Sequence, residues 1–249
     1  MPKVIGIIPS RYNSKRFPGK PLATLAGLPI IVRVIKQAQK ATILDDVIVA
    51  TDDERIAEVV RKHEGKAVIT SGKFSCGTDR IASVAKNLKA DIVMNIQGDE
   101  PMLSPEVITK TANYLIDNPK AVMSTACSKI TDFSEIDNPN DVKVVIAKDN
   151  RALYFSRSRL PWFENKNGQT GSDLPEIYRH IGIYSFTAEF LQTFASLKQT
   201  PLELTEGLEQ LRALENGYDI YCLKASQVFS GIDSREDLSR AEKILQNLR

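Results

Sequence analysis

The stretch that decides the fold class reads V-I-G-I-I-P-S-R-Y-N-S-K-R-F-P-G-K-P-L, from Val4 to Leu22. Its apolar start, residues 4–8, has the composition of a buried strand. A polar loop with small residues and prolines follows, and it carries four cations: Arg11, Lys15, Arg16 and Lys20. An α/β sheet binds its ligands just beyond the carboxyl ends of its strands. Because backbone N–H groups, Lys and Arg complement several negative charges, this loop predicts a triphosphate site, with a solvated basic loop as the alternative.

The remainder of the chain alternates strand-like and helix-like segments. Apolar strand patterns occur at residues 4–8, 46–50, 66–70, 91–96, 121–127, 142–147, 153–155, 181–186 and 220–224. Helical spacing occurs at residues 30–41, 53–63, 78–88, 105–118, 188–196, 203–216 and 234–248. Because the strands are nearly continuous apolar runs separated by helices, we expect an α/β fold with a parallel sheet covered on both faces. A polar stretch at residues 163–173 is a candidate lid or connection.

Length and composition are those of a globular protein. The 249 residues are 42% hydrophobic and carry a net charge of +2, and no apolar run approaches the roughly 20 residues that span a bilayer. A net charge this small gives no strong positive electrostatic field to attract nucleic acid, so we expect neither nucleic-acid binding of that kind nor membrane insertion. A first strand that begins within three residues predicts no secretory signal, and three scattered cysteines predict reduced thiols in the cytoplasm. The first loop matches neither G-x-G-x-x-G nor the Walker A pattern, so a nucleotide would be bound in another way.

A second motif, I-V-M-N-I-Q-G-D-E-P from Ile92 to Pro101, leads an apolar strand into an acidic turn. The strand end should bring Asp99 to the rim where the cationic loop lies, and Gly98 allows a close backbone approach. A carboxylate beside a polyphosphate suits Mg²⁺, a hard cation that takes oxygen ligands. We therefore predict Asp99 as a magnesium ligand, with a solvated aspartate in a plain turn as the alternative.

Two further polar segments begin predicted helices, and each leaves two interpretations open. In S-G-I-D-S-R-E-D-L, from Ser230 to Leu238, Asp233 either caps the last helix or joins Asp99 on the metal ion, and the sequence alone favours the cap. In G-T-D-R, from Gly77 to Arg80, the polar residues fit a helix start. The alternative is that Arg80 and the loop backbone frame a nucleotide base.

Polar residues of the second half lie in otherwise apolar patterns. Arg157, at the end of a predicted strand, could clamp a carboxylate through two N–H groups or form a surface ion pair. His180 and Tyr184 stand at the two ends of a short strand segment, where a lone histidine is more often structural. Glu209 and Gln210 fall off the apolar face of the predicted helix 203–216, so they meet either solvent or a cleft.

Taken together, these segments resemble the 3-deoxy-manno-octulosonate cytidylyltransferase family, also called CMP-Kdo synthetase. The similar segments follow the family's order over essentially the whole chain: residues 7–22, 50–55, 77–80, 95–101, 141–145, 152–161, 179–184, 208–217 and 231–238. They include N-I-Q-G-D-E-P, D-V-K-V-V, A-L-Y-F-S-R-S-R-L-P, R-H-I-G-I-Y and L-E-Q-L-R-A-L-E-N-G. The chain departs from the family pattern at Ser10, where Ala is common, at Cys76, where Ser is frequent, and in the approach to Asp233.

The resemblance implies an enzyme that transfers CMP from CTP to the sugar acid Kdo, giving CMP-Kdo and pyrophosphate for lipopolysaccharide synthesis. It implies a mixed, mostly parallel central sheet flanked by helices, the Rossmann-like nucleotidyltransferase fold, with a smaller lobe. We expect a single domain over residues 1–249, in which 1–128 and 218–249 mainly bind nucleotide. Residues 129–217 would form the sugar-binding and dimerisation lobe of a cytoplasmic homodimer.

The resemblance also implies a role for each candidate site residue. Arg11 and Lys20 would bind the CTP phosphates as catalytic cations, and Arg80 would help to hold the nucleotide. Asp99 and Asp233 would act in catalysis by ligating Mg²⁺. The remaining substrate-binding residues would be Ser14, Arg16, Gln97, Arg157, His180, Tyr184, Glu209 and Gln210.

Other functions are compatible with parts of this pattern. Some relatives use an 8-amino form of the sugar acid, although the retained G-D-E-P with Glu100 leans toward the ordinary sugar. A cytidylyltransferase for a sialic-type acid or a polyol phosphate would share the cationic first loop. A nucleotide-binding module without catalysis would need that loop but not two separated metal carboxylates.

Overall fold

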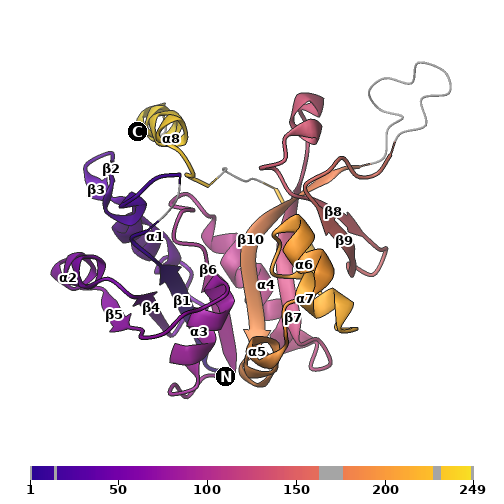
Figure 1. Cartoon of the computed structure of the whole chain (residues 1–249), viewed down its shortest axis with the longest axis horizontal. Helices are drawn as coiled ribbons and strands as arrows, with labels where there is room; N and C mark the ends of the chain where they lie inside the picture. Colours follow the sequence, from indigo (N-terminus) through magenta and orange to yellow (C-terminus); the bar gives the residue numbers. More distant parts are fainter. Residues whose placement is uncertain (1, 14–15, 163–175, 227–230, 248–249) are drawn as a thin grey trace.

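The computed structural model describes residues 2–13, 16–162, 176–226 and 231–247. Its centre is a nine-stranded mixed sheet in the order β11-β7-β10-β6-β1-β4-β5, and β8 pairs with both β10 and β9. Helices cover both faces of this sheet (Figure 1). The predicted α/β class, with a mixed central sheet flanked by helices, is thereby confirmed.

The elements lie close to their predicted positions. The sheet strands are β1 Val4–Ser10, β4 Asp46–Thr51, β5 Lys66–Ile69, β6 Ile92–Ile96, β7 Met123–Lys129, β8 Lys143–Ile146, β9 Ala152–Ser156, β10 Tyr178–Thr187 and β11 Tyr221–Ala225. The α-helices are α1 Ile30–Ala38, α2 Glu54–Lys62, α3 Gly77–Ala85, α4 Pro105–Asp117, α5 Ala188–Ser196, α6 Pro201–Glu206, α7 Leu211–Glu215 and α8 Arg235–Asn247. None of the helices in the described ranges is both long and apolar enough to cross a membrane.

The short elements were not predicted. They are the hairpin of β2 Thr24–Leu25 and β3 Leu28–Pro29, and the 3-10 turns η1 Lys20–Leu22 and η2 Phe133–Asp137. A two-residue strand or a single 3-10 turn is too short to show a repeating hydrophobic pattern, which is the main signal in a sequence.

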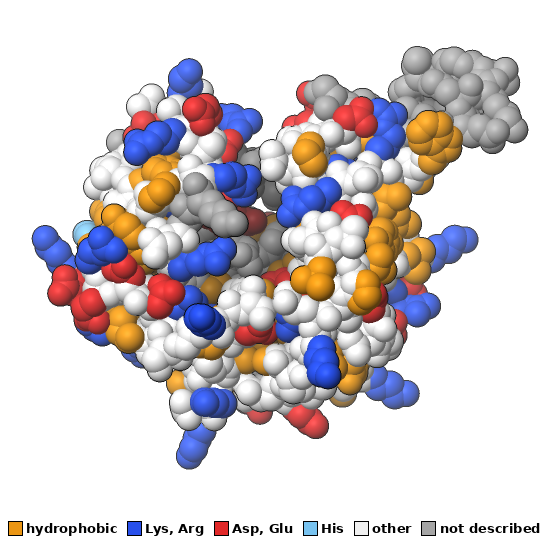
Figure 2. All heavy atoms as spheres, viewed as in Figure 1, with side chains coloured by type: hydrophobic (Ala, Val, Ile, Leu, Met, Phe, Trp, Pro, Cys, Tyr) orange, Lys and Arg blue, Asp and Glu red, His pale blue; other side chains and the backbone are white. Residues whose placement is uncertain are grey.

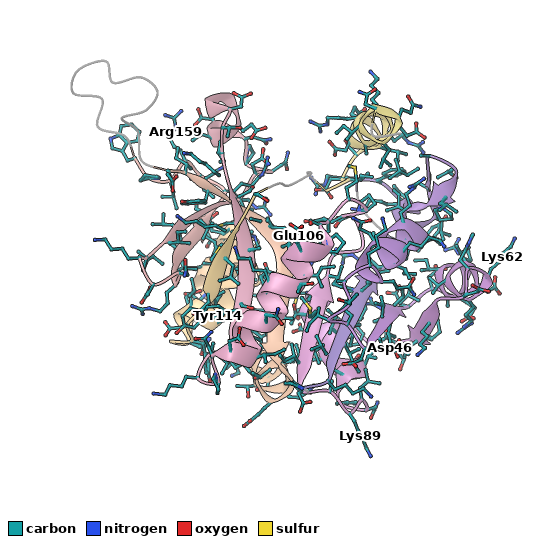
Figure 3. All side chains as sticks on the ribbon, turned by 180° about the vertical axis from the view of Figure 1, so that it is seen from behind. Asp46, Lys62, Lys89, Glu106, Tyr114 and Arg159 are labelled. Carbon is teal, nitrogen blue, oxygen red and sulfur yellow. The ribbon has the colours of Figure 1, made fainter. Side chains whose placement is uncertain are left out.

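The two faces of β1 bury alternate side chains in two hydrophobic clusters. Val4 and Ile8 pack with residues of α1, α2 and α4, whereas Ile5 and Ile7 pack with residues of α3 and α5. All four side chains are at most 3% exposed. Because both faces are covered, the strand reads as a continuous apolar run instead of an alternating one. Figure 3 shows α4 from behind, with Glu106 toward the end that faces the opening of the molecule and Tyr114 at the far end.

One antiparallel strand joins two groups of parallel strands. β1 is parallel to β4 and β6, β4 is parallel to β5, and β7 is parallel to β11. β10 runs antiparallel between β6 and β7. Since Ile183 of β10 lies opposite Ile96, the last residue of β6, the residues before Ile183 extend beyond the end of β6. β10 therefore carries side chains into the space where α/β sheets bind ligands.

The helix expected over residues 203–216 is in fact two helices. Gly207 separates α6 from α7 with a φ of 64°, a left-handed conformation that suits glycine at a helix C-terminus. Leu204, which a single helix would place on the apolar face, is 64% exposed. Because the helix is interrupted here, Glu209 and Gln210 lie between α6 and α7 and line the cleft described below. For these two residues the sequence had allowed two alternatives, contact with solvent and contact with a cleft, and the structure shows the second.

Candidate active site

A cleft of about 620 Å³ opens beyond the carboxyl end of β6. Its walls come from the turn after β6, the start of β10, the end of β9, the segment after α6 and the segment around the start of α8. Figure 2 shows a hollow between the part of the molecule that carries α8 and the part that carries β8 and β9, with Lys and Arg side chains on both rims. A cavity of this size and polarity suits a charged ligand of moderate size.

The turn after β6 delivers Gln97 and Asp99 to this cleft, as the sequence predicted. Gly98 between them packs against β1, where a Cβ atom would lie 3.0 Å from the carbonyl oxygen of Pro9. Glycine is needed here because two backbones approach closely. The Asp99 side chain is 29% exposed, and its Oδ2 accepts a hydrogen bond from Lys20 Nζ at 2.7 Å. Asp99 is therefore not the solvated aspartate of a plain turn.

The segment before α8 brings Asp233 to the same place. The Ile232 N–H donates to the carbonyl oxygen of Asp99 at 2.9 Å, which holds the two acidic segments side by side. Other residues cap α8: Ser234 Oγ accepts from the Asp237 N–H at 3.1 Å, and Asp237 Oδ2 accepts from the Ser234 N–H at 2.9 Å. The Asp233 carboxylate is not the helix cap, and it lines the cleft.

Lys20 connects the two carboxylates. Its Nζ lies 2.7 Å from Asp99 Oδ2 and 3.2 Å from Asp233 Oδ1, and its side chain is 13% exposed. Arg16 Nη2 lies 2.9 Å from the other oxygen of Asp233. Two carboxylates that contact one ammonium group are close enough to share a cation.

Asp99 and Asp233 are also the residues that could hold a metal ion. Within the described ranges, no three His, Cys, Asp or Glu side chains gather in a way that could hold one. A pair of carboxylates fits Mg²⁺, which keeps several waters and takes phosphate oxygens of a substrate as further ligands. It fits Zn²⁺ poorly, because zinc sites use three or four protein ligands. The donor set would therefore suit Mg²⁺, which stays a prediction.

Arg157 forms the opposite wall of the cleft, just after β9. Its Nε donates to the carbonyl oxygen of Glu206 at 2.8 Å, its Nη1 to that of Pro139 at 2.9 Å, and its Nη2 to that of Gly207 at 3.5 Å. A guanidinium has five N–H donors, so two remain for a ligand. In the described part of the chain these acceptors are carbonyl oxygens and not carboxylates, so Arg157 is not in the surface ion pair that the sequence left open. Its positive charge is available to an anionic ligand.

His180 lies in the cleft lining as a hydrogen-bonded, uncharged ring. Its Nε2 is 2.9 Å from Thr125 Oγ1, and its ring meets that of Phe155 edge-on with the centroids 5.0 Å apart. Burial lowers the pKa of His180 to about 3, so the ring is neutral at pH 7. His180 can therefore offer a hydrogen bond to an anion, but it does not add a positive charge.

A chain of buried hydrogen bonds holds two more of the predicted residues. Thr78 Oγ1 donates to Glu209 Oε1 at 2.8 Å, and Asn95 Nδ2 donates to Thr78 Oγ1 at 2.9 Å. Gln97 Nε2 then donates to Asn95 Oδ1 at 3.1 Å. Burial raises the pKa of Glu209. Thr78 thus links α3 to the cleft instead of capping the helix, and Gln97 and Glu209 are held in fixed positions.

Buried polar groups beside this chain remain available to a ligand. Tyr184 donates its hydroxyl proton to Gln210 Oε1 at 2.9 Å, while the amide nitrogen of Gln210 has no partner among the described residues. Gln210 is 1% exposed, and an unpartnered buried N–H group is costly unless a ligand oxygen satisfies it. Burial and the negative charge of Asp99 raise the pKa of Glu100 to about 8, so this cleft carboxyl is mostly protonated at pH 7.

Other predicted residues lie away from the cleft lining. Arg80 is buried on α3, where its Nη2 is 2.7 Å from Asp52 Oδ2 and its Nη1 donates to Thr70 Oγ1 at 2.6 Å. Arg11 is exposed just after β1. Ser14 and the candidate lid at residues 163–173 lie outside the described residues. The roles of Arg80, Arg11 and Ser14 in holding nucleotide stay predictions.

Two cations of this region were not singled out from the sequence. Arg179 lines the cleft, with its Nη1 3.1 Å from Asp141 and 3.3 Å from Glu135. Lys143 is fully buried beneath the wall that carries Arg157. Both belong to segments that were quoted for the family resemblance, D-V-K-V-V and R-H-I-G-I-Y. From the sequence alone, however, a charged residue in a short strand is expected to face solvent, because its buried partners are not known.

Comparison with curated proteins gives full-length relatives. The family model for cytidylyltransferases matches residues 5–220 of this chain. The 3-deoxy-manno-octulosonate cytidylyltransferase of Trichlorobacter lovleyi is 43% identical over 246 residues, which cover 97% of this chain and 98% of the relative. That of Geobacter metallireducens is 43% identical over 253 residues, which cover 99% and 98%.

Solved structures agree with the sequence relatives. The structure of a CMP:2-keto-3-deoxy-manno-octonic acid synthetase complexed with CTP is similar with a TM-score of 0.92 and 34% identity, and the match covers 99% of this chain and 100% of that one. A 4-diphosphocytidyl-2C-methyl-D-erythritol synthase from Anaerococcus prevotii is 16% identical with a TM-score of 0.62, over 98% of this chain and 99% of that one. The second likeness shows a shared fold.

Proposed function

Because this chain belongs to the 3-deoxy-manno-octulosonate cytidylyltransferase family, we propose that it transfers CMP from CTP to Kdo and releases pyrophosphate. The relatives match over nearly their whole length, which confirms the family and the nucleotidyltransferase activity expected from the sequence. The observation that carries the proposal is the cleft itself, in which Asp99 and Asp233 meet around one cation while Arg157 offers a free positive charge.

The reaction joins two anions, so binding and positioning form most of the catalysis. The anomeric hydroxyl of Kdo attacks the α-phosphorus of CTP in line, the new O–P bond forms, the bond to pyrophosphate breaks, and the hydroxyl proton is released to solvent. The enzyme must neutralise the charge that develops and hold the reactants in that geometry. Lys20 and Arg16 lie beside the acidic pair and supply positive charge for the phosphates. Arg157, across the cleft, binds the carboxylate of Kdo.

We further propose that Asp99 and Asp233 hold Mg²⁺. When bound, the ion supplies Lewis-acid stabilisation of phosphate charge and lowers the pKa of a coordinated hydroxyl. The two carboxylates orient it, and the Ile232–Asp99 hydrogen bond keeps their segments together. With the ion in place, the ammonium group of Lys20 would be free to bind the phosphates, because it and a metal ion compete for the same carboxylate oxygens.

The remaining cleft residues recognise the sugar through hydrogen bonds. The unpartnered amide nitrogen of Gln210 and the neutral ring of His180 can bond to hydroxyl oxygens. These groups place the sugar so that its anomeric hydroxyl faces the acidic pair.

We also propose that the enzyme is a cytoplasmic homodimer that serves lipopolysaccharide synthesis. Large hydrophobic side chains are exposed on and near β9 and α6: Leu153 is 57% exposed, Trp162 82% and Leu204 64%. Figure 2 shows hydrophobic side chains along the flank that carries β8 and β9. Exposed apolar groups of this kind mark interaction surfaces. Light scattering after size exclusion would test the mass, and a monomer at micromolar concentration would refute the dimer.

Pyrophosphate release tests the proposed reaction. Purified enzyme with CTP and Mg²⁺ would be given Kdo, 8-amino-Kdo or N-acetylneuraminate, with a reaction lacking sugar as the control. We expect release that depends on Kdo, and at most slow release with the sialic-type acid. Faster turnover of 8-amino-Kdo would move the substrate to that analogue. Release that does not depend on any of the three acids would refute the assignment.

A further inference from the structure

We infer that Lys143 is a positioning residue that fixes the backbone of Arg157 and thereby aims its guanidinium at the sugar carboxylate. The inference rests on the proposed function, because it assumes that Arg157 meets the carboxylate of the sugar acid. It assigns a use to the buried lysine of D-V-K-V-V, which takes no part in the chemistry described so far.

Lys143 is placed by two strand pairings. On β8 it lies opposite Ser156 of β9 and opposite Arg179 of β10, so its side chain starts where three strands meet. The residue is 0% exposed. Its Nζ donates to the carbonyl oxygen of Arg157 at 2.8 Å and to that of Asn138 at 2.9 Å. One ammonium group therefore links the strand end after β9 to the segment after η2, two parts of the cleft wall.

The side chain of Arg157 links the same segments from the other side. Its Nη1 donates to the carbonyl oxygen of Pro139 at 2.9 Å, next to the Asn138 carbonyl that Lys143 holds. The Arg157 N–H also donates to Glu206 Oε2 at 2.9 Å, which ties the strand end to α6. The backbone of Arg157 is thus held on one side by Lys143 and on the other by Glu206. The direction of its two free N–H groups follows from these bonds.

A fully buried ammonium group needs a reason, since desolvation penalises the charged form. Burial lowers the pKa of Lys143, while the negative charges of Asp141 and Asp137 on the same wall oppose that change. Asp137 is itself paired with Arg159, whose Nε lies 2.9 Å from Asp137 Oδ1 (Figure 3 labels Arg159). An apolar side chain could fill the same space, but it would leave the two partly buried carbonyl groups without these hydrogen bonds. The ammonium group of Lys143 therefore fixes the positions of these two segments of the cleft wall.

The test is a double-mutant cycle on KM. Lys143→Met removes the two hydrogen bonds and keeps the length of the side chain, and Arg157→Ala removes the guanidinium. We expect Lys143→Met to raise KM for Kdo about tenfold and to leave KM for CTP within twofold, because only the sugar wall shifts. In the Arg157→Ala background, Lys143→Met should change KM for Kdo by less than twofold, since no guanidinium is left to position.

Several outcomes separate this role from a general structural one. A rise in KM for CTP equal to that for Kdo, or the same tenfold effect in both backgrounds, would overturn the inference. Leu115→Ala is the matched control: it opens the core on α4, at the end marked by Tyr114 in Figure 3, and should lower the melting temperature without changing either KM. If Lys143→Met does not fold, Lys143→Gln takes its place in the cycle, because its neutral amide ends one atom short of the lysine nitrogen and cannot bond both carbonyl oxygens as Lys143 does. Wild-type enzyme that releases no pyrophosphate with Kdo would instead refute the proposed function.

Discussion

Replacement of Lys20 by methionine tests the acidic pair most directly, because the lysine occupies the place of the proposed metal ion. Its Nζ contacts Asp99 at 2.7 Å and Asp233 at 3.2 Å, and Arg16 contacts Asp233 at 2.9 Å. A divalent cation that binds without nucleotide must displace the ammonium group from both carboxylates. Lys20→Met abolishes that competition and leaves the carboxylates in place. We therefore expect the variant to bind metal more tightly than the wild type.

The size of the effect follows from the burial of each contact. The contact between Lys20 and Asp99 has side chains 13% and 29% exposed, so it counts as a hydrogen bond between charged groups, near the lower end of about 1.5–3 kcal/mol. The contact with Asp233, which is 40% exposed, is screened by solvent and adds less than about 1 kcal/mol. A total of about 1.5–2 kcal/mol corresponds to roughly 10- to 30-fold in a dissociation constant.

The assay is titration with Mn²⁺, followed by electron paramagnetic resonance in the absence of nucleotide. Mn²⁺ takes the same oxygen ligands as Mg²⁺ and is visible to this method. Metal-free CTP should bind more weakly to Lys20→Met, because the variant lacks a cation for the phosphates. Arg16→Met, which removes one exposed contact to Asp233, should tighten Mn²⁺ by less than about fivefold. Unchanged or weaker Mn²⁺ binding by Lys20→Met would refute the competition and the shared site.

Three further predictions concern catalysis, pH and stability. Asp99→Asn and Asp233→Asn should fold normally and lose at least about 3–4 kcal/mol of transition-state stabilisation, seen as a fall in kcat of two orders of magnitude or more. His180, neutral in the fold with a pKa of about 3 against 6.5 for a free histidine, should by itself lower the unfolding free energy by about 2 kcal/mol between pH 7 and pH 5, because only the unfolded chain gains the proton there; the raised pKa of Glu100 acts in the opposite direction, so the effect is measured against His180→Gln. Arg212→Met should cost about 3–5 kcal/mol in urea unfolding, because it leaves Glu203, 4% exposed, as an unpaired buried charge.

Each of these has an outcome that contradicts it. Near wild-type turnover in either aspartate variant would remove that residue from the metal site. The unfolding free energy of His180→Gln relative to that of the wild type should rise by about 2 kcal/mol from pH 7 to pH 5, and a difference that does not change with pH would show that His180 does not contribute. Arg61→Met breaks an exposed pair with Glu54 on α2 and should cost less than about 1 kcal/mol. Equal losses for Arg61→Met and Arg212→Met would show that burial of the ion pair is not the cause.

Local patterns in the sequence were sufficient for the elements of the sheet. Apolar runs located β1, β4 and β6, because strands buried on both faces need no tertiary information to be recognised. The same reasoning failed over residues 203–216, where one apolar period ran through a break at Gly207. A hydrophobic period does not show whether a glycine in its middle continues the helix or takes a positive φ, since packing on either side decides between them.

The sequence by itself determined the fold class, the family and the chemical type of the site residues, because these follow from short segments read one at a time. Only the tertiary structure decided which charged residues meet: that Lys20 holds Asp99 and Asp233 together, that Ser234 leaves Asp233 free of the helix cap, and that Lys143 lies beneath Arg157. The physical reason is that a charged side chain looks alike in the sequence whether water or a buried carbonyl group is its partner. The partner of each charged side chain depends on the sheet topology: β10 lies between two sets of parallel strands and brings their ends to one cleft.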